Sequence, residues 1–120
     1  ISFVINECKK NQTIPLTEGT QRRDFIYIDD VCDAFTTVLD HLDILDSFVE
    51  VDVGTGVSTP VREVVEEIKY LTKSRSKLMF GEVPLRDNDV FEMCADTSKL
   101  QSLGWKPRHT LKEGLTKIIL

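Results

Sequence analysis

The chain has 120 residues, of which 41% are hydrophobic, and it carries a formal net charge of −5 at pH 7. This length and composition are typical of one globular domain, whereas the acidic balance argues against a general nucleic-acid or membrane surface. Its three cysteines lack the Cys-x-x-Cys spacing of redox and zinc sites, which favours reduced thiols in a cytoplasmic protein.

The first thirty residues predict a helix followed by two extended segments. Apolar residues recur at helical spacing over residues 1–10, and residues 13–17 form a short extended segment. The aromatic and β-branched run 25–28 predicts a second strand. Asp29 or Asp30 is then the expected N-cap of the next helix.

The middle of the chain predicts two amphipathic helices separated by a strand. Apolar residues continue at helical spacing over 31–45, and residues 48–53 predict the strand. Thr59 is the expected N-cap of the second helix, with Pro60 at its first position. That helix is expected to end near residue 71.

The last part of the chain predicts one more strand and two helices. Residues 77–80 favour a strand, which a polar loop follows. Thr97 is the expected cap of a short helix that Gly104 ends, and Thr110 with Glu113 forms a capping box for the final helix. The order of these elements predicts a mixed α/β fold without internal repeats.

No pattern in the sequence assigns a cofactor, a catalytic group or a metal. The turn Gly54-x-Gly56 has Thr59 where a dinucleotide-binding motif has its third glycine, and a tight turn explains both glycines. Lys73 follows Tyr70 one residue too closely for the Tyr-x-x-x-Lys pair of short-chain dehydrogenases. The two histidines have no partner at metal-ligand spacing. Catalytic and metal-binding residues are therefore predicted to be absent.

Two arginines in polar surroundings, Arg23 and Arg86, allow two interpretations. The planar guanidinium group suits phosphate oxygens, but each arginine also lies close in sequence to aspartates. Composition alone favours two surface ion pairs.

Six segments in a fixed order resemble the C-terminal portion of the NAD-dependent epimerase/dehydratase family, within the extended short-chain dehydrogenase/reductase superfamily. The segments are Gly19-x-Gln21-x-Arg23-Asp24-Phe25-Ile26-Tyr27-Ile28-Asp29-Asp30-Val31-x-Asp33-Ala34, Val53-Gly54-Thr55-Gly56, Arg86-x-x-Asp89, Ala95-Asp96-Thr97-Ser98-Lys99-Leu100, Leu103-Gly104-Trp105-Lys106-Pro107 and Leu111-x-Glu113-Gly114-Leu115. The resemblance covers nearly the whole chain.

This resemblance implies an α/β, mixed, small substrate-binding domain, residues 1–120, without the N-terminal Rossmann half. Residues 48–72 are expected to pack on that missing half, and their loss of neighbours predicts a partly exposed apolar face. The first residue is an isoleucine within an apolar pattern rather than a methionine, which suggests a longer parent protein. NAD or NADP is expected in the parent enzyme and not in these residues, and a homodimer of the parent is another expected partner.

The resemblance also assigns substrate-binding residues, namely Arg23, Arg86, Ile14, Leu16, Asp52, Asp89 and Met93. Arg23 and Arg86 are implied to approach the diphosphate of a nucleotide sugar, and both are expected to face one cleft near the turn 54–56. Ile14 and Leu16 fall in the strand that lies beside the base.

Two of these positions depart from the family pattern. Many relatives carry asparagine at Asp52, next to the nucleotide, and an aspartate there would meet a ribose hydroxyl or point away from phosphate. Met93 stands where 4-epimerases of UDP-sugars often place a tyrosine, which argues against a specific epimerase.

The implied parent is an NAD(P)-dependent nucleotide-sugar epimerase, dehydratase or 4-ketoreductase, and these residues alone are expected to be inactive. The alternative is a stand-alone module that binds a nucleotide sugar without catalysis, or an isolated fragment. The sequence leaves the sugar, the base and the reaction open.

Overall fold

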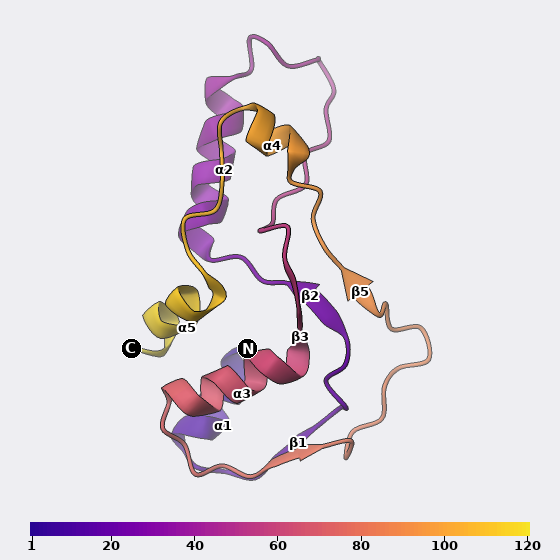
Figure 1. Cartoon of the computed structure of the whole chain (residues 1–120), viewed down its shortest axis with the longest axis vertical. Coiled ribbons are helices and arrows are strands. Elements are labelled where there is room, and N and C mark those ends of the chain that lie inside the picture. Colours follow the sequence, from indigo (N-terminus) through magenta and orange to yellow (C-terminus); the bar gives the residue numbers. More distant parts are fainter.

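The computed structural model describes residues 1–120 as a flat, elongated molecule whose two ends are joined by its central strands (Figure 1). Its principal extents are 52 × 35 × 16 Å and its radius of gyration is 16.9 Å. A compact domain of this length has a radius of gyration of about 13.6 Å. The fold therefore exposes more surface than a compact domain of equal length.

Five helices and five short strands make up the fold, and none of the helices is long and apolar enough to cross a membrane. In chain order they are α1 (Ser2–Lys9), β1 (Ile14–Leu16), β2 (Arg22–Asp24), α2 (Ile28–Asp40), β3 (Ser58–Pro60), α3 (Val61–Leu71), β4 (Leu78–Phe80), β5 (Glu92–Met93), α4 (Ser98–Ser102) and α5 (Leu111–Ile119).

The strands form two small sheets. In one sheet β1 pairs with β4 in parallel. In the other, β2 lies in the centre, antiparallel to β3 on one side and parallel to β5 on the other. Figure 1 shows α1, α3 and the first sheet at one end of the molecule and α2 with α4 at the other. The central sheet connects these ends.

Several sequence predictions are confirmed. The first helix, the extended segment 13–17 and the strand 77–80 occur as α1, β1 and β4. The hydroxyl of Thr110 accepts the backbone N–H of Glu113, and the Glu113 carboxylate accepts the N–H of Thr110, so the capping box of α5 is complete. Thr97 is the N-cap of α4.

The two predicted strands that flank α2 are wrong. The second strand is β2, at Arg22–Asp24, and not residues 25–28. Residues 48–53 have no ladder partner and form no strand. β-Propensity marks residues that suit a sheet, but a strand exists only where a neighbouring backbone accepts and donates its hydrogen bonds.

The predicted helix boundaries need three corrections. Tyr27 is the N-cap of α2 instead of Asp29 or Asp30, and the helix ends at Asp40 instead of continuing to residue 45. Pro60 is the N-cap of α3, because Thr59 is held in β3 by its pairing with Arg23. An aspartate in the first turn still interacts favourably with the positive end of the helix dipole.

The main hydrophobic core lies between α1, α3 and α5. Its buried members are Val4, Ile5, Cys8, Ile14, Val64, Val65, Ile68 and Leu115. A smaller cluster of Ala34, Leu100 and Trp105 joins α2 to α4, and Val51 and Val53 pack against it. The segment 51–53 is thus held by side-chain packing and not by a ladder.

An apolar face remains uncovered on α2 and the segment that follows it. Phe35 and Leu39 are 64% and 63% exposed, and Phe48 is 80% exposed. A partly exposed apolar face is therefore present, although the sequence placed it on residues 48–72 and it lies mainly on α2 and the segment after it. It does not extend over the apolar side of α3, because Val64 and Ile68 are buried within this chain.

Candidate functional site

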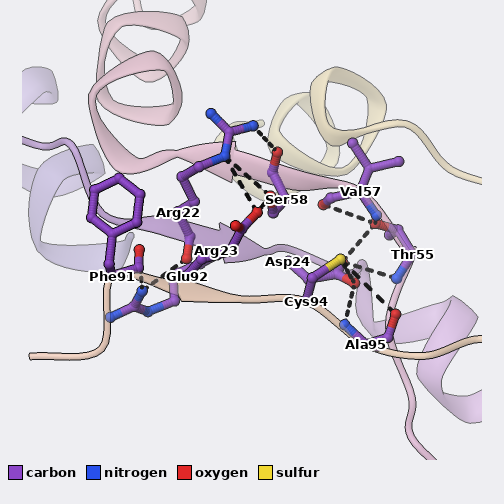
Figure 2. A network of polar contacts seen from close by, with 10 residues as sticks. All are labelled: Arg22, Arg23, Asp24, Thr55, Val57, Ser58, Phe91, Glu92, Cys94 and Ala95. Carbon is purple, nitrogen blue, oxygen red and sulfur yellow. Dashed lines mark hydrogen bonds and ion pairs between the residues drawn. The ribbon is translucent and has the colours of Figure 1, made fainter.

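The centre of the candidate site is the carboxylate of Asp24, the last residue of β2. It accepts the backbone N–H groups of Thr55 and Gly56, each at 2.9 Å, and the hydroxyl of Thr55. It also accepts the backbone N–H of Ala95 at 3.3 Å. Figure 2 shows Thr55 and Ala95 converging on Asp24 from two segments that lie about thirty and seventy residues further along the chain.

Hydrogen bonding sets the charge state of Asp24. Burial raises the pKa of this carboxyl, but the donors of Thr55, Gly56 and Ala95 together outweigh burial, so the pKa lies below its ordinary value. No cation pairs with Asp24. The carboxylate is therefore ionised near neutral pH and is held by neutral donors.

The N–H groups of the Gly54-x-Gly56 turn are engaged within the protein. A glycine-rich turn binds phosphate through free backbone N–H groups, but here the N–H groups of Thr55 and Gly56 already donate to Asp24. A phosphate would also meet the negative charge of that carboxylate. The turn does not fit the pyrophosphate of a dinucleotide.

Arg23, the neighbour of Asp24 in β2, lies at the edge of an open hollow of about 780 Å³. Its guanidinium group donates to the Asp89 carboxylate at 3.0 Å, and 25% of its side chain is exposed. A further N–H donates to the backbone carbonyl of Arg22 at 2.8 Å. These contacts leave part of its five N–H donors unused.

The hollow has three walls, which come from distant parts of the sequence. They are β2 with Arg23 and Asp24, the segment 51–53, and the segment 92–95, with Phe35 of α2 beside them. The lining contains one guanidinium group and three carboxylates, those of Asp24, Asp52 and Glu92.

Each carboxylate that lines the hollow interacts with a donor group of the protein. Glu92 lies 3.6 Å from the guanidinium group of Arg22, and the hydroxyl of Ser58 donates to Glu92 (Figure 2). Asp52 accepts the backbone N–H of Asp96 at 3.2 Å. Their negative charge is thus partly balanced within the protein.

The structure brings three of the seven predicted site residues, Arg23, Asp52 and Met93, to this hollow. Asp89 joins them through its contact with Arg23. Arg86 does not line the hollow; it is exposed in the loop before β5 and forms no ion pair.

The two remaining predicted residues lie in β1, in the other sheet. The side chain of Ile14 is fully buried in the main core, and Leu16 is half-buried beside it. The backbone N–H of Ile14 also donates to the carbonyl of Lys77 at 2.9 Å, so Ile14 offers no free group to a ligand.

Asp24 lies within the first family motif, but no sequence pattern assigned it a role. A signal was present, because a Gly-x-Gly turn without a phosphate ligand still needs an acceptor for its N–H groups. Glu92, Cys94 and Ala95 carried no such signal, since only the pairing of β5 with β2 brings them to Arg23.

A second polar cluster ties α2 to α5, and none of its residues lines the hollow. The buried Asp30 carboxylate accepts the backbone N–H of His109 at 3.0 Å and lies 2.9 Å from its Nδ1. Lys117 Nζ lies 2.9 Å from His109 Nε2, and because an ammonium group only donates, a hydrogen bond between them uses Nε2 as the acceptor.

Burial also raises the pKa of Asp30, but the hydrogen bonds from His109 and the backbone of Arg108 outweigh it, so the pKa lies below its ordinary value.

No group of three His, Cys, Asp or Glu side chains is placed to hold a metal ion.

Comparison with known proteins adds evidence over the whole chain. The family model described as GDP-mannose 4,6 dehydratase matches residues 1–118. CDP-abequose synthase of Salmonella muenchen is 40% identical over 119 residues, which are 99% of this chain and 40% of that protein. The chain thus spans well under half the length of the curated relatives it matches.

Solved structures show the same fold. UDP-glucose 4-epimerase of Thermotoga maritima, solved with UDP-glucose, superposes with a TM-score of 0.82 at 26% identity, over 98% of this chain and 37% of that one. MoeE5, in complex with UDP-glucuronic acid and NAD, gives a TM-score of 0.82 at 31% identity, over 98% of this chain and 39% of that one. The mixed α/β fold predicted from the sequence is confirmed.

Proposed function

This chain belongs to the NAD-dependent epimerase/dehydratase family, and from that premise we propose that it forms the substrate-binding part of a nucleotide-sugar epimerase, dehydratase or 4-ketoreductase. The observation that carries the proposal is the hollow beside Arg23, which gathers three of the residues that the family resemblance assigns to substrate. In this proposal the hollow receives the nucleotide sugar and Arg23 contacts its diphosphate.

Electrostatics require a second cation. One guanidinium group among three carboxylates does not balance a doubly negative diphosphate, even though each carboxylate has a partner. Arg86 is free of ion pairs, and the backbone N–H of Asp89 donates to its carbonyl at 3.1 Å in a turn. Because Asp89 also holds Arg23, we propose that this loop brings Arg86 towards the same diphosphate.

The cofactor belongs to another part of the parent enzyme in this proposal. NAD or NADP would supply hydride transfer at the sugar. These residues contribute binding and orientation only, since their one Gly-x-Gly turn is occupied by Asp24. We further propose that the cofactor-binding half covers the exposed apolar face formed by α2 and residues 42–57, which includes Phe35, Leu39 and Phe48.

The test uses the full-length protein and a panel of UDP-, GDP-, CDP- and dTDP-hexoses. Arg23→Ala and Arg86→Ala should each raise KM for the nucleotide sugar by about tenfold or more, because a charge-assisted hydrogen bond contributes roughly 1.5–3 kcal/mol and about 1.4 kcal/mol is a tenfold change. Affinity for NAD should change little. Arg23→Lys should restore binding only in part, because a point charge lacks the planar fork.

Arg75→Ala is the matched control, since Arg75 is an exposed arginine that lies outside the lining of the hollow. It removes the same charge and should leave KM unchanged. Failure of every nucleotide sugar to bind would refute the proposed function. Normal binding by both alanine variants at positions 23 and 86 would refute the phosphate contact alone.

A further inference from the structure

The side chain of Asp24 stands where both ladders of the central strand stop. β2 pairs with β3 as far as Asp24 and Ser58, and with β5 only as far as Arg23 and Met93. Beyond these pairs the hollow's other two walls, residues 51–53 and 94–95, have no ladder with β2. Backbone hydrogen bonds between strands therefore do not fix the distance between these walls.

The Asp24 carboxylate provides the missing connections on both sides. Oδ1 accepts from Thr55, just after the first wall, and Oδ2 accepts from Gly56 and Ala95. One carboxylate thus holds β2, the 54–56 turn and the 94–95 segment in a single network (Figure 2).

The fit around this carboxylate is close. A Cβ placed on Gly54 would lie 2.5 Å from both Ala95 Cβ and Asp24 Oδ2, so no larger residue fits there without displacing a wall. Arg23 precedes Asp24 in the same strand, so a displacement of Asp24 also moves the guanidinium group relative to both walls.

We propose that Asp24 is a positioning residue, which fixes the walls of the nucleotide-sugar hollow around Arg23 without touching the diphosphate. This inference rests on the proposed function. A direct contact with diphosphate is excluded by like charge, and the carboxylate already accepts four hydrogen bonds from Thr55, Gly56 and Ala95.

The test replaces Asp24 by asparagine in the full-length protein. The amide keeps the shape but puts an NH₂ group where one oxygen accepted N–H donors. KM for the nucleotide sugar should rise about tenfold, while kcat and KM for NAD stay within about twofold, because ground-state placement is lost and not the chemistry. Amide hydrogen exchange at Gly56 and Ala95 should accelerate in the same variant.

Asp30→Asn is the matched control. Asp30 is also an aspartate that accepts backbone and side-chain donors, but it lies outside the hollow. Its variant should lower the melting temperature and leave KM unchanged. If Asp24→Asn likewise lowers the melting temperature and leaves KM unchanged, Asp24 has a structural role only and the inference is overturned.

Thr55→Val tests the positioning role of Asp24 if Asp24→Asn does not fold. It removes one hydroxyl donor but keeps the backbone N–H bond and the charge of Asp24, so KM should rise by less, about threefold. Thr55→Ser should restore the wild-type value. In that case, unchanged KM in Thr55→Val, with a wild type that binds, overturns this inference alone. A wild type that binds no nucleotide sugar overturns the proposed function, and the positioning role with it.

Discussion

Replacing Asp30 by asparagine tests whether a buried polar contact contributes more to the free energy of unfolding than an exposed one in this fold. The Asp30 side chain is 1% exposed and accepts two hydrogen bonds from His109, through the backbone N–H and the ring. Hydrogen bonds to a charged group contribute roughly 1.5–3 kcal/mol each. Asparagine keeps one acceptor oxygen and turns an NH₂ group towards the other donor, so we expect a loss of about 2–3 kcal/mol.

The assay is urea unfolding at pH 7, followed by circular dichroism, in which the midpoint should fall while the slope stays constant. Asp33→Asn is the control, because Asp33 lies one turn further along α2 and pairs with Arg108, the neighbour of His109, at 3.0 Å. That pair is exposed, at 72% and 39% of its side chains, and should contribute no more than about 1 kcal/mol. Equal losses in the two variants would refute the reasoning from burial.

Two further predictions concern pH and the glycines. The pKa values of Asp24 and Asp30 lie below the ordinary value, so both carboxylates stabilise the fold fully above about pH 4 and lose this effect as the pH falls through their folded values. The urea midpoint should therefore decrease below about pH 4, less steeply in Asp30→Asn, and parallel slopes would contradict this. Gly54→Ala should cost about 2–3 kcal/mol by overpacking against Asp24 and Ala95. Gly104→Ala meets no atom within 4 Å and only strains a φ of +86°, so thermal unfolding should show a smaller loss, of about 1 kcal/mol.

Local sequence determined those elements whose signals are short-range. The spacing of apolar residues is enough for α1, since Val4, Ile5 and Cys8 form one buried helix face. The capping box of α5 needs only Thr110 and Glu113, three residues apart. The family was also visible in the sequence, because its motifs are runs of consecutive residues whose order along the chain is preserved.

Tertiary structure decided the features that depend on partners far along the chain. β2 formed at Arg22–Asp24 because β3 and β5 pair with it there, although residues 25–28 have the stronger β-propensity. Residues 48–53 have strand composition but no neighbouring strand, and so remain without a ladder.

The same reason separates the predicted site from the observed one. A sequence motif could name Arg23, but the walls around it are set by the hydrogen bonds of Asp24 to residues 55–56 and 95. In the same way Asp30 and His109 meet across 79 residues. Hydrogen bonds are short and directional, so which donor reaches which carboxylate is fixed only when packing has brought distant segments together.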